Sequence, residues 1–409
     1  MKKLISALLV AGLSVAMLAG CGSNGGDSAS TSTAEGTTAA VSASDIKIGV
    51  IYIGDENEGY TESHMKGIDQ MMETLGISEE QVIEKTTIPE SEECYDAAVD
   101  LAEQGCNIIF GTSFGHEDYL KQAAEEFPDV QFCHATGYQA ASSGLSNMHN
   151  YFDNIYEARY VSGVVAGLKL NEMIKDGTVK EDACKIGYVG AYPYAEVVSG
   201  YTSFYLGVKS VCESATMEVQ YTNSWADISK EKETADALIA DGCVLISQHA
   251  DTTGAPSACE EKGVPCVGYN VDMTSVAPTT ALTSSTNNWA VYYEYAVNCV
   301  LNGEAIATDW SEGFSSDSVA LTTLGDACAE GTQDKVDEVI AAIKDGSLNV
   351  FDTTTFTVGG KSIEDLIAEG GDYANYEQYV SDGVFHESTV ISAPAFDLRI
   401  DGITELTTE

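Results

Sequence analysis

Short apolar runs alternate with amphipathic segments along most of this chain, from residue 45 onward. The run DIKIGVIY at residues 45–52 has the length and β-branched content of a buried strand, and residues 61–75 have helical spacing. The same order continues to residue 135 and restarts after a long predicted helix over residues 155–174. Strands that alternate with helices form parallel sheets covered by helices on both faces, so the pattern predicts an α/β protein. Further strands are predicted at residues 81–85, 107–111, 130–135, 185–189, 218–222, 244–248 and 266–269, and further helices at 90–104, 117–127, 195–211 and 228–241.

The two halves of this pattern repeat each other. AVDLAEQGCNIIFGTS and ADALIADGCVLISQHA share Ala, Leu, Gly-Cys and Ile at a constant offset. In each, a helix is expected to end at Gly105 or Gly242, and the following strand leads into a polar loop. A chain of 409 residues also exceeds what one core usually supports, so two lobes are expected. Open α/β sheets bind ligands at the carboxyl ends of their strands, which predicts one cleft between the lobes.

The last hundred residues are less regular. A helix is predicted over residues 333–345, and residues 354–358 and 393–400 have a β-rich pattern. We expect lobe 1 to comprise residues 45–153 with part of 285–330, and lobe 2 to comprise 154–284 with part of the C-terminal segment. Residues 331–409 would then complete the lobes with a helix and strands.

The N-terminus has the pattern of an export signal. Lys2 and Lys3 precede an apolar run over residues 4–20, which is short and interrupted by Gly and Ser. The ending LAGC resembles the lipobox of bacterial lipoproteins, which implies a signal peptide over residues 1–20 and lipidation of Cys21. The alternative is a secretory signal with a chance cysteine. Residues 21–44 are rich in Gly, Ser, Thr and Ala and are expected to be an unfolded tether, so the chain would be extracytoplasmic and anchored by lipid to the outer face of the cell membrane.

Composition narrows the possible partners. With 64 acidic and 19 basic residues the formal net charge is −45, which disfavours nucleic acid and anionic headgroups, since both require clustered Lys and Arg. Besides Cys21, the ten other cysteines include no C-x-x-C pair. They are expected to be buried free thiols rather than disulfides, and no metal site is predicted.

Several blocks in order resemble the basic-membrane-protein (BMP, PnrA-like) family, the substrate-binding lipoproteins of ABC importers for purine nucleosides and related bases. The blocks are GYTESHMKG, IIFGTSFGHEDYL, FPDVQFCHATGY, EARYVSGVVAG, KIGYVGAYPYAEVVSGY, NSWADISKEKETADALIADG, VGYNVDM and SAPAFDLRIDGI. The resemblance implies a periplasmic-binding-protein type I fold, in which two Rossmann-like lobes joined by a hinge enclose a central ligand cleft.

The resemblance also implies ligand-binding residues. Tyr60 matches the stacking aromatic of the first lobe, and Trp225 matches that of the second. Phe114 lies in the loop that approaches the base, while Asn270 and Asp272 occupy the positions of the paired acids.

One departure from the family pattern changes the expected ligand. Nucleoside binders carry a lysine after a Thr-Ser pair to hold the ribose hydroxyls, whereas Thr283-Ser284 is followed here by Ser, Thr and Asn. Together with Asn270 in place of an acid, this favours a free purine such as adenine, or a smaller purine-like base, over a nucleoside.

Other candidate residues follow from the chemistry of a flat heterocycle, which gains from aromatic rings and from acceptors for its N–H groups. Tyr192 and Asp251 lie in predicted loops or strand ends and fit these roles, although Tyr192 could instead brace Pro193. His64 fits either a donor to a ring nitrogen or a bridge between helix and loop. Asp251 and Glu196 equally fit helix N-terminal caps. Trp289 is expected in the core.

These observations predict a binding protein without a cofactor. It would capture a purine base or nucleoside, deliver it to the permease and ATPase subunits of an ABC importer, and act as a monomer anchored only by lipid. A ligand-sensing lipoprotein for the same solute is the first alternative. An exported nucleosidase-type hydrolase is less favoured, because H-E-x-x-H and an assembled Cys-His signature are absent from the sequence and its histidines are scattered.

Overall fold

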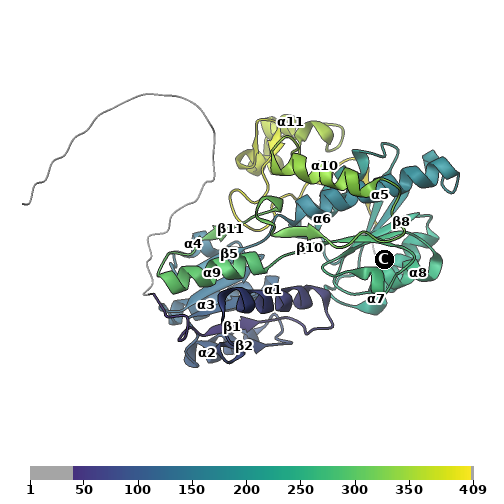
Figure 1. Cartoon of the computed structure of the whole chain (residues 1–409). Coiled ribbons are helices and arrows are strands. Elements are labelled where there is room, and N and C mark those ends of the chain that lie inside the picture. Colours follow the sequence, from purple (N-terminus) through teal and green to yellow (C-terminus); the bar gives the residue numbers. More distant parts are fainter. Residues whose placement is uncertain (1–39, 407–409) are drawn as a thin grey trace, which may run out of the picture. The chain divides into compact units, whose positions relative to one another are not determined.

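The computed structural model describes residues 40–406 and contains two large β-sheets in that range (Figure 1). The predicted signal peptide, Cys21 and the predicted tether up to residue 39 lie outside the described residues. The expectation of an unfolded tether is wrong for residues 40–44, because the N–H of Val41 donates to the Val300 carbonyl at 3.3 Å and the Gln81 side-chain amide donates to the Ala43 carbonyl at 2.9 Å. Among residues 40–406, no helix has the length and apolar character needed to cross a bilayer.

The first sheet is parallel throughout and has the strand order β11-β5-β4-β3-β1-β2. We call the part of the chain built on it lobe 1. Its strands are β1 (Ile48–Ile51), β2 (Val82–Lys85), β3 (Ile108–Gly111), β4 (Gln131–Ala135), β5 (Met148–Tyr151) and β11 (Asp309–Trp310).

The second sheet has the order β12-β10-β9-β8-β6-β7-β15 and is parallel except for the β10–β12 pair. It forms lobe 2. Its strands are β6 (Lys185–Gly190), β7 (Thr216–Tyr221), β8 (Leu245–His249), β9 (Cys266–Tyr269), β10 (Ala281–Asn287), β12 (Val319–Leu321) and β15 (Ile403–Glu405).

Both sheets reverse their strand order at an equivalent place. The chain starts on an inner strand of each sheet, pairs outward once, and then continues on the other side of the starting strand. The switch therefore lies between β1 and β3 in lobe 1 and between β6 and β8 in lobe 2. Loops diverge at such a switch point and leave a crevice at the carboxyl ends of the strands.

Helices cover both faces of each sheet. Buried apolar residues form one large cluster and two smaller ones, and the smaller clusters lie under α2 and α3 in lobe 1 and under α7 and α8 in lobe 2. The helices are α1 (Gly59–Leu75), α2 (Glu92–Glu103), α3 (Glu117–Glu126), α4 (Ala140–Ser143), α5 (Ile155–Asp176), α6 (Ala195–Lys209), α7 (Ile228–Ala240), α8 (Gly254–Lys262), α9 (Ala290–Asn302), α10 (Thr332–Lys344) and α11 (Ile363–Glu369).

The chain crosses between the lobes at several points. It leaves lobe 1 after β5, returns after β10 through α9, and crosses again between β11 and β12. Crossings that lie together form a hinge, so the expected fold of two Rossmann-like lobes with a hinge and a central cleft is confirmed. The helix expected at residues 333–345 is also confirmed, as α10.

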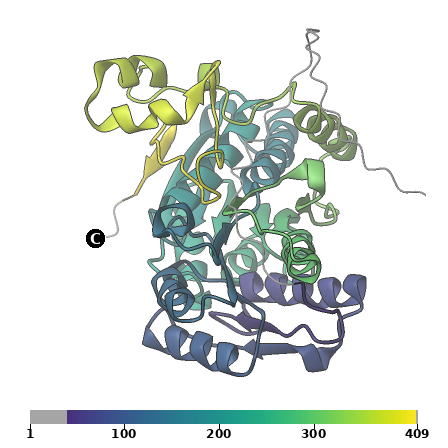
Figure 2. The ribbon, with the colours of Figure 1, turned by 90° about the vertical axis from the view of Figure 1, so that its left-hand side faces the viewer.

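The β-rich character expected at residues 354–358 and 393–400 is wrong. Residues 353–355 form a 3₁₀ turn, and no strand occurs between residues 386 and 402. The alternation of buried Phe396, Leu398 and Ile400 is real, but these side chains pack on the rest of the molecule without a strand partner. The C-terminal strand is β15, which pairs with β7 at the edge of the second sheet (Figure 2).

The ten cysteines between residues 40 and 406 are free thiols, and nine of them are buried. The prediction of buried free thiols rather than disulfides is therefore confirmed for the described part of the chain. Trp289 is fully buried, as expected for a core residue.

Candidate functional site

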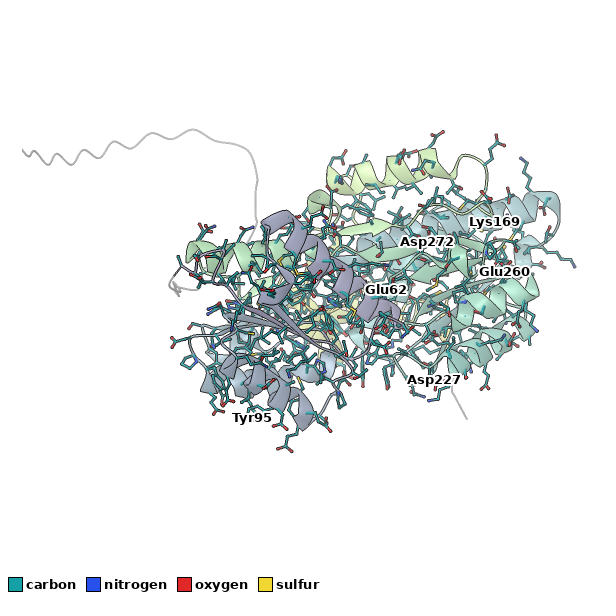
Figure 3. The ribbon with its side chains drawn as sticks, turned by 60° about the horizontal axis from the view of Figure 1, so that its bottom comes forward. Glu62, Tyr95, Lys169, Asp227, Glu260 and Asp272 are labelled. Atoms are coloured by element: carbon teal, nitrogen blue, oxygen red, sulfur yellow. The ribbon has the colours of Figure 1, made fainter. Side chains whose placement is uncertain are left out.

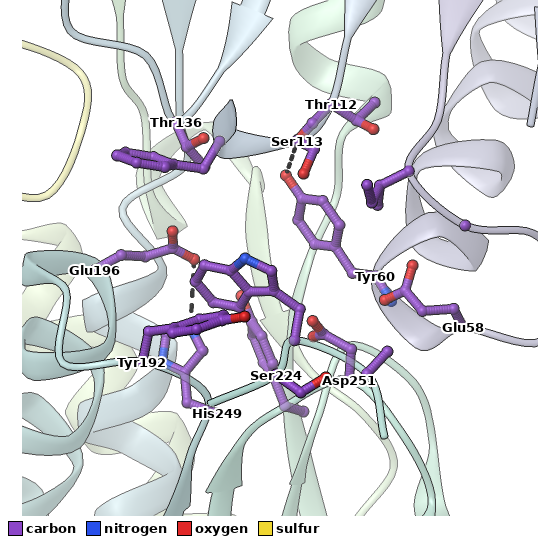
Figure 4. Close-up of a pocket in the computed structure, with 16 residues that line it drawn as sticks. Glu58, Tyr60, Thr112, Ser113, Thr136, Tyr192, Glu196, Ser224, His249 and Asp251 are labelled. Atoms are coloured by element: carbon purple, nitrogen blue, oxygen red, sulfur yellow. Dashed lines mark hydrogen bonds and ion pairs between the residues drawn. The ribbon is translucent and has the colours of Figure 1, made fainter. Parts of the chain in front are cut away.

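A cavity of about 340 Å³ lies between the two lobes, at the carboxyl ends of both sheets (Figure 4). Lobe 1 contributes the loops that follow β1, β3 and β4, and lobe 2 contributes those that follow β6, β7, β8 and β9. The cavity therefore lies at the switch points of both sheets, where the fold predicts a binding site.

Tyr60 stands at the lobe 1 wall of this cavity. The Glu58 carboxylate caps helix α1 by accepting the backbone N–H groups of Tyr60 and Thr61 at 3.0 and 2.9 Å. The Tyr60 hydroxyl donates to the carbonyl of Thr112 at 2.7 Å, which ties the ring to the loop after β3 (Figure 4). His64 supports the ring from behind in an edge-on contact, with 4.5 Å between the ring centroids. Tyr60 is thus held in one orientation.

Trp225 lies on the lobe 2 wall, between β7 and α7. Its carbonyl accepts the backbone N–H of Asp251 at 2.9 Å, which fixes the loop after β7 to the loop after β8. Tyr192 packs edge-on against the indole with 5.2 Å between centroids. Both rings are partly exposed and line the cavity, as does Phe114 from lobe 1.

Two further carboxyl groups face the cavity from lobe 2. Glu196 lies in the first turn of α6, where its Oε1 is 3.3 Å from Nε2 of His249 (Figure 4). Asp251 follows β8, and its Oδ1 accepts the side-chain amide of Asn270 at 2.7 Å. Each carboxyl group therefore has one oxygen held by the protein. In the described structure the other oxygen of each has no protein hydrogen-bond partner.

Burial changes the ionisation of these groups. Desolvation raises the pKa of Glu196 to about 7, an effect that the nearby Arg159 opposes. Desolvation also raises the pKa of Asp251 well above its usual value, and the negative charges of Glu58 and Glu231 add to this. The pKa of His249 is far below its usual value because the ring is buried. The contact between His249 and Glu196 is therefore a hydrogen bond to a neutral imidazole and not an ion pair.

A buried arginine lies behind the floor of the cavity without lining it. Arg159 donates to the carbonyl of Gln248 at 2.6 Å and to the hydroxyl of Tyr188 at 3.0 Å. Its guanidinium carbon lies 3.8 Å from the centroid of the Tyr269 ring, and Tyr269 forms part of the cavity wall. Among the described residues that line the cavity, none is a lysine or an arginine.

The cavity brings together most of the predicted site residues, which come from distant parts of the chain. Those that line it are Tyr60, Phe114, Tyr192, Glu196, Trp225 and Asp251. Neither acid caps a helix: the cap position of α6 is Tyr194, and Asp251 precedes α8 without capping it.

His64, Asn270 and Asp272 do not line this cavity. His64 is fully buried, stacks on Trp289 and hydrogen-bonds the Tyr293 hydroxyl at 2.6 Å, so its position on α1 places it in the core. Asn270 adopts a left-handed backbone with φ 64°, a conformation that Asn tolerates, and it holds Asp251 in place. Asp272 is exposed (Figure 3) and caps a 3₁₀ turn by accepting the N–H of Thr274 at 2.8 Å. Asn270 and Asp272 line a separate, smaller cavity.

Sequence reasoning missed Glu58, His249 and Tyr269 among the lining residues. His249 and Tyr269 are the last residues of β8 and β9, so their position at the carboxyl end of a strand was the available signal. Glu58 could have been found as the acid before the first turn of a predicted helix.

Comparison with known proteins identifies the family. The model of the family described as ABC transporter substrate-binding protein, PnrA-like, matches residues 46–351. This chain belongs to that family. Its members are solute-binding proteins rather than enzymes, and substrate-binding proteins of ABC importers act outside the cytoplasm. The resemblance found in the sequence is therefore confirmed.

Two relatives of this family member are informative. A purine-binding protein of Brucella abortus is 35% identical over 310 residues, which cover 75% of this chain and 83% of the relative. A putative ABC transporter glucose-binding protein of Haloferax volcanii is 29% identical over 389 residues, which cover 90% of this chain and 94% of the relative.

Solved structures support the same fold. A solute-binding protein of an ABC transporter system from Aeropyrum pernix superposes with a TM-score of 0.63 at 17% identity, over 79% of this chain and 96% of that chain. At that level of identity the similarity concerns the fold alone.

Proposed function

We propose that this family member binds a free purine base, adenine-like in its pattern of N–H donors, between Tyr60 of lobe 1 and Trp225 of lobe 2. The observation that carries the proposal is the composition of the cavity, which combines aromatic rings from both lobes with carboxyl oxygens that lack protein partners. Stacking contributes roughly 1 to 3 kcal/mol per base. The purine-binding relative supports the same ligand class.

The polar groups of the cavity favour a ligand rich in N–H donors. Glu196 and Asp251 would accept hydrogen bonds from an exocyclic amine and a ring N–H. A ligand without these donors would leave a buried carboxyl group unpaired, which is costly and supplies the discrimination.

The same groups disfavour phosphorylated ligands. A phosphate would enter a cavity that has three carboxyl groups in its wall and no Lys or Arg among its described lining residues. The lysine that holds ribose in nucleoside binders of the family is absent here, because Ser285, Thr286 and Asn287 follow the Thr-Ser pair. Thr286 and Asn287 line the smaller, separate cavity. We therefore expect the free base to bind more tightly than its nucleoside.

In this proposal the ligand bridges the lobes and favours the closed state through its higher affinity for that state. The closed protein, anchored through lipid on Cys21 and the tether that follows it, would then deliver the base to the permease as a monomer. A sensor role for the same ligand fits the site equally, whereas nothing in the cavity specifically favours a hydrolase.

A sugar is the second candidate ligand, because the Haloferax volcanii relative is named as a putative glucose-binding protein and matches almost the whole chain. Aromatic rings and carboxyl groups also bind sugars, through C–H faces and hydroxyls. The experiment must therefore include a sugar.

A thermal-shift screen of the chain from Asp45 onward tests the proposal, with adenine, adenosine, adenosine monophosphate and glucose as ligands. We expect adenine to raise the melting temperature most, since a ligand that binds only the folded state stabilises it. Stabilisation by glucose alone, or by adenosine more than adenine, would contradict the proposed ligand.

Substitution of Trp225 tests the stacking. Trp225→Ala should weaken adenine binding by roughly tenfold or more through the lost stacking while leaving the ligand-free melting temperature nearly unchanged. Trp310→Ala is the matched control, because Trp310 is also partly buried but packs on Tyr295 away from the cavity. Equal adenine binding by both variants would remove Trp225 from the site.

A further inference from the structure

An aromatic pair joins the two lobes at the edge of the cavity. Phe114 begins the 3₁₀ turn η2 (Phe114–His116) after β3 of lobe 1, and Tyr194 is the residue before α6 of lobe 2. Their rings are stacked, with 5.5 Å between centroids and an interplanar angle of 27°. Both are partly open to solvent, with 38% of Phe114 and 42% of Tyr194 exposed. The pair therefore lies where the cavity meets the surface.

In lobe 2, further aromatic contacts connect this pair to the cavity wall. Tyr194 stacks on Tyr192 with 5.1 Å between centroids and an angle of 12°, and Tyr192 packs against Trp225. On the lobe 1 side, Tyr138 approaches Phe114 at 6.3 Å and is 51% exposed. Tyr138 and Phe114 belong to the same lobe, so their contact can persist when the lobes separate. The Phe114–Tyr194 stack joins the two lobes and must break.

A second contact between the lobes lies at the start of α1. The backbone N–H of Gly59 in lobe 1 donates to the carbonyl of Asp251 in lobe 2 at 3.0 Å. A Cβ at position 59 would lie 3.1 Å from that carbonyl oxygen, so a glycine permits this approach. Exchange of the Gly59 amide hydrogen therefore reports opening of the lobes at a position remote in sequence from the aromatic pair.

We propose that Phe114 and Tyr194 form a latch that holds the lobes closed independently of ligand and slows the release of a bound ligand. Tyr194 is a positioning residue in this latch, since it does not line the cavity. Offset-stacked aromatic pairs are stabilising beyond the area that they bury, and opening the lobes would return both faces to water. The closed state therefore has a favourable contribution that exists before any ligand arrives.

The latch has a direct consequence for exchange of the ligand. Opening would require this stack to break, so the latch sets part of the barrier to release. This consequence rests on the proposed function, whereas closure of the ligand-free lobes does not.

Hydrogen–deuterium exchange of the full-length, ligand-free protein in detergent tests the latch. Local opening determines the exchange rate of a protected amide, so removing the stack should speed exchange at Gly59. We expect Tyr194→Ala to raise this rate by roughly two- to tenfold, the range that corresponds to one aromatic pair. The side chain of Tyr194 makes no capping hydrogen bond to α6, so this substitution removes no helix cap.

Two control variants make the result specific. Tyr138→Ala removes another exposed ring, which contacts Phe114 within lobe 1, and Tyr194→Phe keeps the stacked ring. Both should exchange at Gly59 like the unmodified protein. Equal rates for Tyr194→Ala and Tyr138→Ala would overturn the latch.

The same samples with adenine separate this proposal from the proposed function. If adenine protects none of the variants, the proposed ligand fails while the ligand-free comparison still decides the latch. If adenine protects the unmodified protein and Tyr194→Ala releases it no faster than Tyr138→Ala does, the role in release is wrong.

Discussion

Glu196 and His249 meet at the floor of the cavity, where burial leaves the carboxyl group close to its ionisation midpoint at neutral pH. The pKa of Glu196 is raised to about 7. In the ligand-free protein, the raised pKa of Glu196 stabilises the folded state. This contribution to stability is complete when the pH is below the ordinary glutamate pKa of about 4.5, and it is lost as the pH rises through 7. The pH dependence of ligand binding should have the opposite sign, because an N–H donor is bound by the ionised carboxylate.

The affinity for adenine should therefore rise with pH between 6 and 8. Below pH 7 the ligand must displace a proton from Glu196, which weakens binding by at most about tenfold per pH unit. Titration calorimetry across this range measures the effect. Glu196→Gln should bind more weakly at pH 8 and lose most of the pH dependence, although Asp251 also has a raised pKa. Affinity that increases toward pH 6 would show that a protonated carboxyl group donates to the ligand instead.

At the scale of the elements, helices α5 and α6 cross at close range and pack together in the core of lobe 2. A Cβ on Gly163 would lie 2.0 Å from the Phe204 carbonyl oxygen, and a Cβ on Gly207 would lie 2.0 Å from the Tyr160 carbonyl oxygen. The two glycines therefore allow each backbone to approach the other helix. α6 also carries Glu196 at its start, so the crossing helps to position the cavity wall.

Gly207→Ala should destabilise the protein by about 1–3 kcal/mol or more, because the methyl group would meet backbone atoms that cannot move aside alone. Helix propensity by itself predicts the opposite sign, a gain of up to about 1 kcal/mol. Urea unfolding followed by circular dichroism distinguishes the two. An unchanged or higher midpoint would contradict the packing described for this crossing.

The regular elements were predictable because their cause is local. The strand β1 and the helix α7 follow from apolar runs and helical spacing, and Tyr60, Trp225 and Asp251 follow from loops at predicted strand ends together with the family resemblance. His64 and Asn270 do not line the cavity, and this could not be foreseen because the sequence does not reveal which side of a helix or turn faces it. The sequence 393–400 has a strand-like alternation, yet in the described structure it pairs with no strand.

At the scale of the whole molecule, the segment after residue 351 lies beyond the part matched by the family model but is attached to both lobes. The N–H of Ser392 donates to the Asp309 carboxylate of lobe 1 at 3.0 Å, and β15 pairs with β7 of lobe 2. The buried Glu387 accepts the N–H of Phe396 at 2.8 Å, and Phe396 stacks on Phe351 with 4.4 Å between centroids. This segment is therefore expected to unfold together with the lobes.

Phe396→Ala should lower stability by about 3–5 kcal/mol and shift a single thermal transition, because a large side chain is removed from a fully buried position. Val390→Ala in the same segment is the control, since Val390 is 44% exposed and its substitution should change stability by about 0.5 kcal/mol or less. Differential scanning calorimetry measures both. A separate low-temperature transition in the Phe396 variant would show that the segment folds independently of the lobes.

The central claim is that a purine base lies between aromatic rings supplied by the two lobes. A crystal structure of the protein grown with adenine tests it most directly. We predict the purine plane between the Tyr60 and Trp225 rings, with a ligand nitrogen within hydrogen-bonding distance of Glu196 or Asp251. Adenine bound elsewhere, or a cavity in which these two rings do not contact the base, would contradict the account.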